Sequence, residues 1–568
     1  QTRQNTASGG IVLVRVPAQS TGGQGRRGFY PRRMFDYRAV TAASLRTDTE
    51  ETLAACDALV EEMVSVDGPR TWANTAEPQL EAQRLQAGLY GRVPFMSQAH
   101  PDEDVRLAAR ELEEHISQWG IALTYRRDVY EAFAAYAENP DEDLTDEQSR
   151  WLEFELRDYV LAGHGLDDEA RTELERSNTR LSELALTYAS NVNENDDHLD
   201  VPVEDLDGLP EPLIAGLGDG AAPGTKRVTM DYPDVVPALQ MVKSRKVRRE
   251  LSRIFNSRCA VENRPILEEA IGLRMRVAKL FGLDSWTDYR LQTRMAGGSA
   301  PVQAMYDRLV PPLTEKAHDE AAAMEALLVA DGESPPLTRA DYSYYEDQLR
   351  QSDFGVDQHA ASQYFELERT MQGLLDLTSE VFGLTYRKVE DPPTWHEDVT
   401  LYEVTDAESQ QPIGHFYADL FPREGKFGHA AAFPVLVAHD TADGRQSPVT
   451  AFLCNFPKPT GDQPSLLMHT DVVTLFHEFG HVLHMTLSKA STPRFSGAST
   501  EWDFVEAPSQ IMEHWCWTPE VLARFAFHHE TGEPIPTELV DQLTAAKNLN
   551  VALFNLRQIA LGKIDQGY

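Results

Sequence analysis

Hydrophobic positions recur every three or four residues along most of this chain, and this spacing predicts amphipathic helices. The helical pattern begins near residue 41, with acidic and arginine residues on one face and Leu, Ala, Tyr and Trp on the other. Asp102 and Thr145 each precede a long periodic segment, where their side chains can cap a helix. The longer helices are expected at 101–138, 145–196, 234–259, 263–295, 301–330, 358–384, 470–489, 504–517 and 536–560.

A different pattern occupies residues 385–456. Short runs such as WHEDVTLYEVTD, PIGHFYADLF and SPVTAFLCNF alternate or stay apolar over strand-like lengths, and turn-prone stretches separate them. Pro- and Gly-rich loops break the helical pattern at about 200–235, with one short strand expected at 226–230. The chain is therefore predicted to be mainly α-helical, with a small, mostly antiparallel sheet.

Three parts of the chain differ in character. Residues 1–40 begin with a Gly-, Ser-, Gln- and Arg-rich stretch that is nearly free of acids, which predicts a poorly ordered extension. Residues 41–235 form an N-terminal helical region, and residues 236–568 form a second region that holds the candidate chemistry described below. No fixed-period repeat is present, which argues against a solenoid.

Charge and cysteine content narrow the classes of partner. The 568 residues carry a net charge of −38, which opposes binding to phosphate backbones and anionic lipid. Four cysteines lie far apart without a C-x-x-C pair, so a disulfide framework or thiolate cluster is not indicated. No apolar run reaches the ~18–20 residues of a membrane span. We expect a cytoplasmic monomer that binds neither nucleic acid nor membrane.

The strongest chemical signal is the sequence His477-Glu478-Phe479-Gly480-His481, an HExxH motif. Histidines four residues apart project from the same face of a helix, where two imidazoles can bind one Zn²⁺ ion. Glu478, beside the first histidine, is placed to act as a general base. The surrounding residues are strongly apolar, which predicts a buried helix. This motif therefore favours a zinc peptidase.

A catalytic zinc site needs a third protein ligand from a neighbouring element. Four acids follow the motif at a suitable distance, namely Glu501, Asp503, Glu506 and Glu513. A helix over 504–517 places Glu506 and Glu513 on one face. Spacing alone does not choose among the four.

Seven segments together resemble the thimet oligopeptidase family of zinc metallopeptidases, which includes oligopeptidase A and bacterial dipeptidyl carboxypeptidase. The resemblance runs in the family's order from about residue 40 to the end. Its segments are TWANTAEPQLE (71–81), 263–291, WHEDVTLYEV (395–404), 414–433, PSLLMHTDVVTLF (464–476), HEFGHVLH (477–484) and DFVEAPSQIMEHW (503–515).

This resemblance implies a fold and a set of ligands. It implies one Zn²⁺ per chain bound by His477, His481 and Glu506, with Glu478 as the catalytic base. It also implies a large helical body of two lobes around a deep channel, with the small sheet near the zinc. Such a channel admits short peptides and excludes folded proteins, so short peptides are the expected substrates.

Other residues near the motif are weaker candidates. Glu513 is expected to support a ligand imidazole from behind, against the alternative of an ordinary structural acid. His429 and Ala430 belong to a segment that resembles the channel-lining strand of the family, so we expect them to contact the substrate backbone. We expect His484 to be a packed core histidine and His469 and His514 to be structural. Three charged residues are expected either to contact the peptide or to form structural ion pairs, namely Arg423, Glu424 and Lys426.

The end of the sequence departs from the family. Members of the family continue beyond the point at which this sequence stops, and their further segment includes a Gly- and Tyr-rich loop that contacts the substrate. Residues 236–568 are therefore expected to be C-terminally incomplete relative to the family. The leading hypothesis is an endopeptidase of short oligopeptides. The alternatives are a peptidyl-dipeptidase that releases C-terminal dipeptides, and a zinc- and peptide-binding protein with little turnover because the loop is absent.

Overall fold

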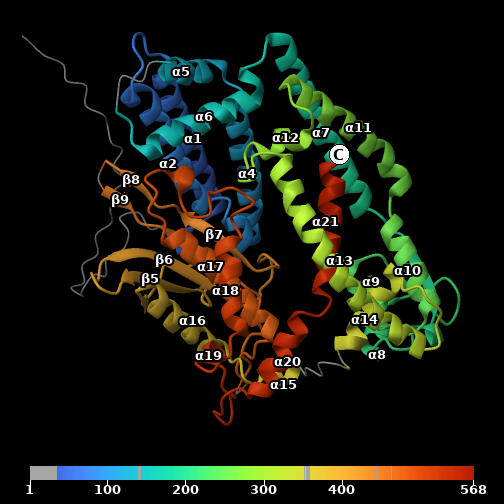
Figure 1. Cartoon of the computed structure of the whole chain (residues 1–568). Helices are drawn as coiled ribbons and strands as arrows, with labels where there is room; N and C mark the ends of the chain where they lie inside the picture. The colour runs from blue at the N-terminus through green and yellow to red at the C-terminus, as the bar shows by residue number, and fades with distance from the viewer. Residues whose placement is uncertain (1–34, 139–142, 351, 353–357, 443, 462) are drawn as a thin grey trace, which may run out of the picture. The chain divides into compact units, whose positions relative to one another are not determined.

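The computed structural model describes residues 35–138, 143–350, 352, 358–442, 444–461 and 463–568, which are mainly helical with small sheets (Figure 1). The extension predicted for residues 1–40 lies mostly outside the described residues. Its last six residues, however, belong to the folded chain. Tyr37 is buried, and its hydroxyl donates a hydrogen bond of 2.7 Å to the carbonyl of Gly91. Tyr37 is therefore part of the packed structure.

The N-terminal region is helical, as expected. Its helices are α1 (Ala42–Val64), α2 (Glu77–Arg92), α3 (Met96–Ala99), α4 (Glu103–Thr124), α5 (Arg127–Glu138), α6 (Asp146–Tyr159), α7 (Asp168–Asn193) and α8 (Glu211–Gly216). The caps predicted at Asp102 and Thr145 are confirmed, because each side chain accepts a hydrogen bond from a backbone N–H in the first turn of α4 or α6.

Several segments predicted as single helices are divided, and two of them, 101–138 and 145–196, lie in the N-terminal region. The first is interrupted at Tyr125, between α4 and α5. In the second, α6 is followed by a π-helical turn, Val160–His164, and α7 begins at Asp168. Gly163 has a φ of 100° in this turn, a backbone conformation that side chains rarely tolerate. Hydrophobic periodicity does not report such a break, because the apolar face continues on both sides of it.

A three-stranded sheet separates this region from the next group of helices. Its strands are β1 (His198–Pro202), β2 (Gly218–Asp219) and β3 (Thr225–Thr229), in the antiparallel order β1-β3-β2. β3 confirms the strand predicted at 226–230, whereas β1 and β2 were not predicted. The helices that follow are α9 (Tyr232–Met241), α10 (Arg245–Ser257), α11 (Ala260–Leu280), α12 (Trp286–Leu291), α13 (Ser299–Ala330), α14 (Arg339–Leu349), α15 (Gln358–Ser362) and α16 (Leu367–Phe382).

The larger sheet lies where strands were predicted, and it is mostly antiparallel. Its strands are β4 (Leu384–Lys388), β5 (Thr400–Asp406), β6 (Pro412–Asp419), β10 (Val449–Leu453) and β7 (Ala431–Leu436), in that spatial order. Only the β6–β10 pair in this sheet is parallel. A separate hairpin joins β8 (His439–Thr441) to β9 (Gly444–Gln446). β7 is an edge strand of the larger sheet.

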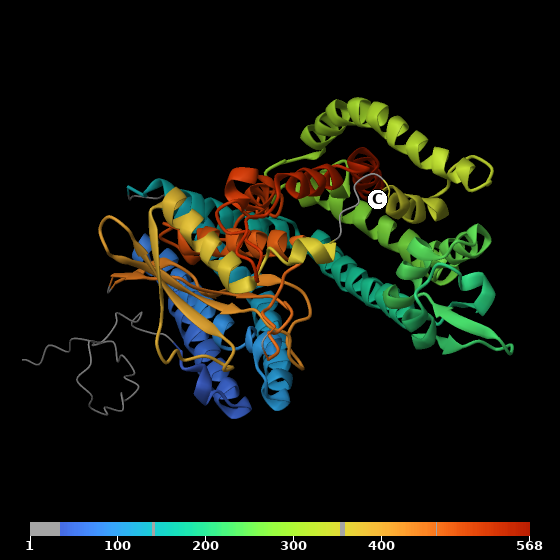
Figure 2. The same ribbon diagram turned by 90° about the horizontal axis from the view of Figure 1, so that it is seen from below.

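Helices cover both faces of this sheet. Phe416 of β6 points to the face covered by α16 and by α17 (His469–Thr486), and its ring lies 5.3 Å from that of Phe479. The next residue, Tyr417, points to the other face, where its ring lies 5.9 Å from Tyr37. Figure 2 shows the sheet between α16, in yellow, and the blue N-terminal helices. Because both faces of the sheet are buried, its edge strand β7 is held rigidly in place.

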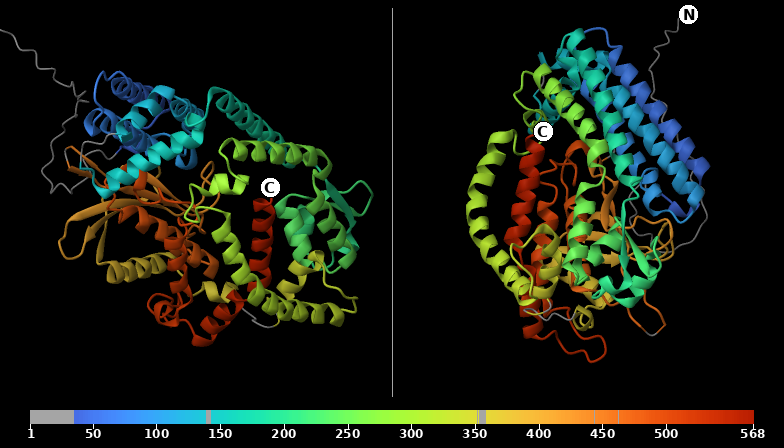
Figure 3. Two further views of the ribbon diagram at one scale, coloured as in Figure 1. Left: turned by 45° about the horizontal axis from the view of Figure 1, so that its top comes forward. Right: turned by 90° about the vertical axis from the view of Figure 1, so that its right-hand side faces the viewer.

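The remaining helices follow α17 along the chain. They are α18 (Ala507–Glu513), α19 (Pro519–Leu522), α20 (Thr537–Lys547) and α21 (Val551–Gln566). α21 runs beside α13, as Figures 1 and 3 show. Within the described residues, no helix combines the length and the apolar character that crossing a membrane requires.

A buried histidine in the larger sheet makes stability depend on pH. Burial lowers the pKa of His415 to about 4, although Glu403 opposes this shift. The unfolded chain binds this proton below about pH 6.5, and the native chain binds it only near pH 4. The unfolded state therefore holds more protons between these values, so stability falls as the pH drops through this window. We expect His415 to contribute a loss of about 1–2 kcal/mol between pH 7 and pH 5.

Urea unfolding of the wild type and of His415→Gln at the two pH values measures this contribution. The variant should lose less stability on acidification than the wild type. His115→Gln, which changes an exposed histidine, should behave as the wild type does. Identical pH dependence in the wild type and His415→Gln would contradict the assignment.

Candidate functional site

The HExxH residues lie on α17, one of the most buried helices of the described structure. Val472, Leu475, Phe476 and Phe479 pack into the core between this helix and the larger sheet. His477 and His481 project from the opposite side, with their ring centroids 5.0 Å apart. Asp471, the third residue of the helix, accepts a hydrogen bond from the N–H of Met468 at 3.0 Å. α17 therefore holds the two imidazoles on a fixed face.

A close approach between two helices brings an acid to these imidazoles. A Cβ atom on Gly480 would lie 2.6 Å from the Cα of Ser509, so only glycine allows α18 to approach so near. Glu506, the residue immediately before α18, then lies over both histidines. Its Oε2 is 3.3 Å from Nε2 of His477 and 3.1 Å from Nε2 of His481. These three side chains form a group able to hold a metal ion.

The other three acids that follow the motif lie elsewhere. Glu513 contacts His477 from behind, with 2.8 Å between its Oε1 and Nδ1 of the ring. Asp503 accepts hydrogen bonds of 3.0 Å from the backbone N–H groups of Met295 and Ala296. Glu501 pairs with Arg150. Of the four acids, Glu506 is the one that approaches both imidazoles.

The donor atoms fit a tetrahedral metal ion. Ligand atoms at about 2.0–2.1 Å from Zn²⁺ lie about 3.3 Å apart when the coordination is tetrahedral. The two contacts of Glu506 Oε2 have this length. An Nδ1–H of His477 that donates to Glu513 leaves the lone pair of Nε2 directed at the group. A tetrahedral ion held by these three side chains would keep a fourth position open.

Glu478 is the buried acid of this site. Its pKa rises to about 7 because burial disfavours the carboxylate, with Glu506 adding to the effect and His477 and the backbone N–H of Ala432 opposing it. Ala432 belongs to the edge strand β7. The carboxyl group of Glu478 is thus placed between the imidazoles and the edge of the sheet.

The predicted substrate contacts lie at the start of that edge. His429 and Ala430 immediately precede β7, and the carbonyl of His429 accepts a hydrogen bond of 3.3 Å from the amide of Asn455. His429 is exposed and Ala430 is half-buried. Their position next to an edge strand is compatible with binding an extended peptide. Their role in substrate binding stays a prediction.

Of the three histidines expected to have packing or structural roles, His469 and His484 do pack, whereas the expectation for His514 is wrong because its side chain is exposed. His469 is buried, and one of its ring nitrogens lies 2.8 Å from the carbonyl oxygen of Cys516. The ring of His484 lies 6.2 Å from that of Phe504. His514 is exposed at the start of a 3-10 turn. None of these three belongs to the group of His477, His481 and Glu506.

One residue that contacts the candidate metal site, Ser509, was not predicted from the sequence. The hydroxyl of Ser509 is fully buried and lies 2.8 Å from Oε2 of Glu506, to which it can donate a hydrogen bond. It orients the carboxylate that faces the two imidazoles. A serine three residues after a glutamate at a helix start is the available sequence signal, since these positions face each other across the first turn.

The sequence of this chain is similar to that of known peptidases. Residues 238–568 match the model of peptidase family M3. The chain is 35% identical over 539 residues to thimet-like oligopeptidase of Dictyostelium discoideum, covering 92% of this chain and 80% of that protein. It is 31% identical to oligopeptidase A of Escherichia coli (91% and 78%) and 30% identical to saccharolysin of Saccharomyces cerevisiae (92% and 76%).

Proposed function

Because the chain belongs to peptidase family M3, we propose that it is a zinc-dependent endopeptidase that hydrolyses internal bonds of short oligopeptides. The family membership confirms the resemblance found in the sequence. The observation that carries the finer proposal is the group of His477, His481 and Glu506, with the buried carboxyl group of Glu478 beside it.

We propose that this group holds one Zn²⁺ ion per chain. Two imidazole nitrogens and one carboxylate oxygen are the ligands typical of a catalytic zinc site. When bound, such an ion would lower the pKa of water and polarise a carbonyl group. Glu513 would keep the ring of His477 in the tautomer that presents Nε2, and Ser509 would hold the carboxylate of Glu506.

Glu478 is the proposed general base and acid. Its carboxylate takes a proton from the attacking water while the oxygen of that water adds to the carbonyl carbon of the peptide. The same carboxyl group then gives the proton to the leaving nitrogen as the C–N bond breaks. The N–H of Ala432 donates to Glu478, which orients the group toward the edge strand.

The edge of the larger sheet is the proposed place for the substrate. A peptide in extended form could pair with an exposed edge through its backbone, which recognises length and conformation more than sequence. His429 and Ala430 would contact that backbone where β7 begins. The names of the relatives describe oligopeptidases, and this supports short peptides as the substrates.

Product analysis tests the proposal. The zinc-loaded protein is incubated with a ten-residue peptide, and the products are identified by mass spectrometry, with chelator-treated protein as the control. Internal cuts that the chelator abolishes are expected. Successive loss of C-terminal dipeptides would favour a peptidyl-dipeptidase instead. Peptide binding without cleavage, at one zinc per chain, would favour the zinc- and peptide-binding alternative.

Loss of the Ser509 hydroxyl should weaken metal binding. We expect Ser509→Ala to lower zinc affinity about 10–100-fold, because the carboxylate of Glu506 loses the donor that orients it. Competition with a chromogenic chelator measures the affinity. Ser182→Ala, which removes a hydroxyl that bonds only to a carbonyl of its own helix, should keep the affinity of the wild type. Equal affinities in Ser509→Ala and the wild type would contradict the role of Ser509.

A further inference from the structure

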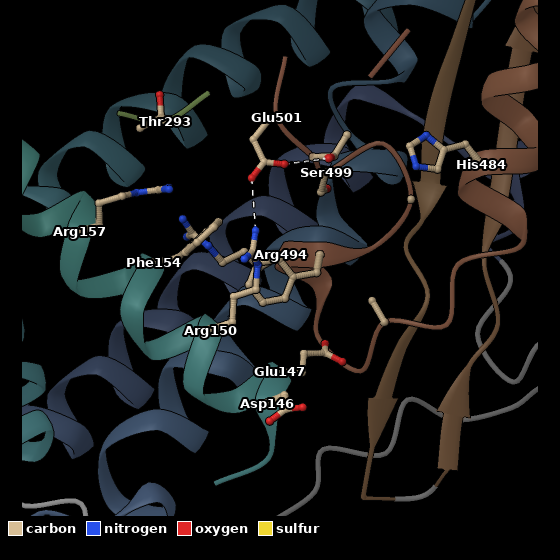
Figure 4. A pocket seen from close by; sticks show the side chains of 14 residues that line it. Asp146, Glu147, Arg150, Phe154, Arg157, Thr293, His484, Arg494, Ser499 and Glu501 are labelled. Carbon is tan, nitrogen blue, oxygen red and sulfur yellow. Dashed lines mark hydrogen bonds and ion pairs between the residues drawn. The ribbon is translucent and has the colours of Figure 1, made fainter. Parts of the chain in front are cut away.

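A cavity of about 590 Å³, shown in Figure 4, is lined in part by α17, the helix that carries the two histidines of the candidate metal site. One wall is a face of α6 that carries Arg150, Phe154 and Arg157, and the other is the segment 490–501 that leads from α17 toward Glu506. His484 also lines the cavity. It follows His481 by three residues, about 4.5 Å along the helix axis. We call this cavity the Phe154 pocket.

The ring of Phe154 organises three arginines. The guanidinium carbon of Arg157 lies 4.0 Å from the ring centroid, that of Arg150 lies 4.5 Å away, and that of Arg494 lies 5.4 Å away. Phe495 packs edge-on against Phe154 at 5.5 Å and extends this surface. Stacking on aromatic rings holds a guanidinium plane in one orientation while its N–H groups stay directed outward.

Arg494 is fully engaged in holding the two walls together. It donates to Glu155 at 2.9 Å and also to Asp158, both on α6. Burial alone would raise the pKa of Glu155 and lower that of Arg494, so each of these buried charges depends on its partner. Arg494 is therefore a structural element of the Phe154 pocket.

Arg150 and Arg157 keep unused donors. Within the described residues, Arg150 makes one hydrogen bond, of 3.4 Å to Glu501, and Arg157 uses Nε and one terminal nitrogen on Asp158. A guanidinium has five N–H donors, so each retains several that bond to nothing else within the described part of the chain. Figure 4 shows the ion pair between Arg150 and Glu501, which joins the two walls of the pocket.

The acidic residues that line the Phe154 pocket are engaged in other interactions. Glu147 accepts hydrogen bonds of 2.8–3.0 Å from the backbone N–H groups of Ser491 and Thr492. Glu501 also accepts one from the hydroxyl of Thr500 at 3.0 Å. Asp146 is exposed in the first turn of α6, where a negative charge favours the helix. The pocket thus offers more free donors than free acceptors.

We propose that the Phe154 pocket binds a carboxylate of the peptide substrate, with Arg150 and Arg157 as specificity-determining residues. The carboxylate belongs either to an acidic side chain or to the C-terminus of the peptide. The carboxylate of the peptide takes the place of Glu501 on Arg150 and forms shorter, charge-assisted hydrogen bonds with the guanidinium group. This proposal rests on the proposed peptidase function, because the peptide must reach the pocket from the neighbouring metal site.

Matched peptides test this assignment. A neutral ten-residue fluorogenic peptide is varied by one Glu at each position in turn, each with a Gln partner, and by a free or amidated C-terminus. We expect one member to exceed its neutral partner about tenfold in kcat/KM. A Glu at one position identifies a side-chain carboxylate, and a preference for the free C-terminus identifies the terminal one.

Two variants connect that preference to the pocket. The double variant Arg150→Gln, Arg157→Gln should bring the ratio between the preferred peptide and its neutral partner close to one. Arg180→Gln removes one positive charge from α7 outside the pocket, where it pairs with Glu269, and should keep the tenfold ratio. Equal cleavage within every peptide pair by the wild type, or an equal loss for both members of the preferred pair in the double variant, would overturn the proposal.

A binding measurement separates this proposal from the peptidase proposal. If the zinc-loaded protein cleaves none of the peptides, the peptidase function fails. Fluorescence anisotropy then reports whether the labelled acidic peptide binds about tenfold more tightly than its neutral partner and whether the double variant removes this difference. A positive result supports the carboxylate pocket without turnover, and a negative result rejects it.

Discussion

Glutamine in place of Glu478 is expected to lower kcat by about 10²–10⁴-fold while the metal stays bound. The amide has nearly the same shape as the carboxylate, so the buried surroundings of α17 need not rearrange. It cannot accept the proton of the attacking water. The three candidate ligands are His477, His481 and Glu506, and none of them changes.

Two measurements are needed together for this variant. An internally quenched peptide gives kcat, and elemental analysis after dialysis gives the zinc content per chain. Glu397→Gln makes the same chemical change at an exposed position and should retain activity and zinc. A Glu478→Gln variant that keeps most of its activity, or that loses its zinc, would remove Glu478 from the role of general base.

Removing the carboxylate of Asp419 is expected to destabilise the protein by about 3–5 kcal/mol, because it leaves buried cations without their counter-charge. Asp419 is fully buried, accepts from Arg423 at 2.7 Å and from the indole of Trp395 at 2.9 Å, and forms an ion pair with Lys426 at 2.9 Å. Burial alone would raise the pKa of Asp419, but the hydrogen bonds of Arg423 and the charge of Lys426 hold it below its usual value. The ion pairs predicted for Arg423 and Lys426 are thereby confirmed.

The cluster also supports the connection to β7, the edge strand at which substrate is proposed to bind. Lys426 donates to the carbonyls of Asp419, Phe421 and Cys454 at 2.6–2.8 Å, which fixes the connection from β6 to β7. Thermal and urea unfolding of Asp419→Ala measure the loss of stability. Adding Lys426→Met removes one uncompensated cation and should restore part of it. Equal stability of Asp419→Ala and the wild type would show that the cations find solvent or other partners.

Local patterns determined a large part of this protein. The histidines of HExxH lie on one face because a helix repeats every 3.6 residues, and this required no knowledge of the rest of the chain. The alternation over 385–456 likewise predicted the larger sheet, and Asp102 and Thr145 marked helix starts that the structure confirms. These features depend on interactions among residues near one another in the sequence.

Breaks in the backbone of a helix could not be predicted from hydrophobic periodicity. Gly163 and Asn550 both have positive φ and divide segments whose apolar face continues, so periodicity read each as one helix. The parallel pairing of β6 with β10 was equally hidden, because alternation gives the face of a strand and not its partner.

The identity of the third candidate ligand was not determined by local sequence and depends on the tertiary structure. Spacing left four acids open as the third ligand, and only the resemblance to a family pointed to Glu506. In the fold, the approach of Ser509 to Gly480 carries Glu506 over both imidazoles. The Phe154 pocket likewise joins Arg150 to Glu501 across 351 positions of the chain. Helical repeat sets directions within one element, whereas close packing of distant elements sets which side chains meet, and only the folded chain contains that information.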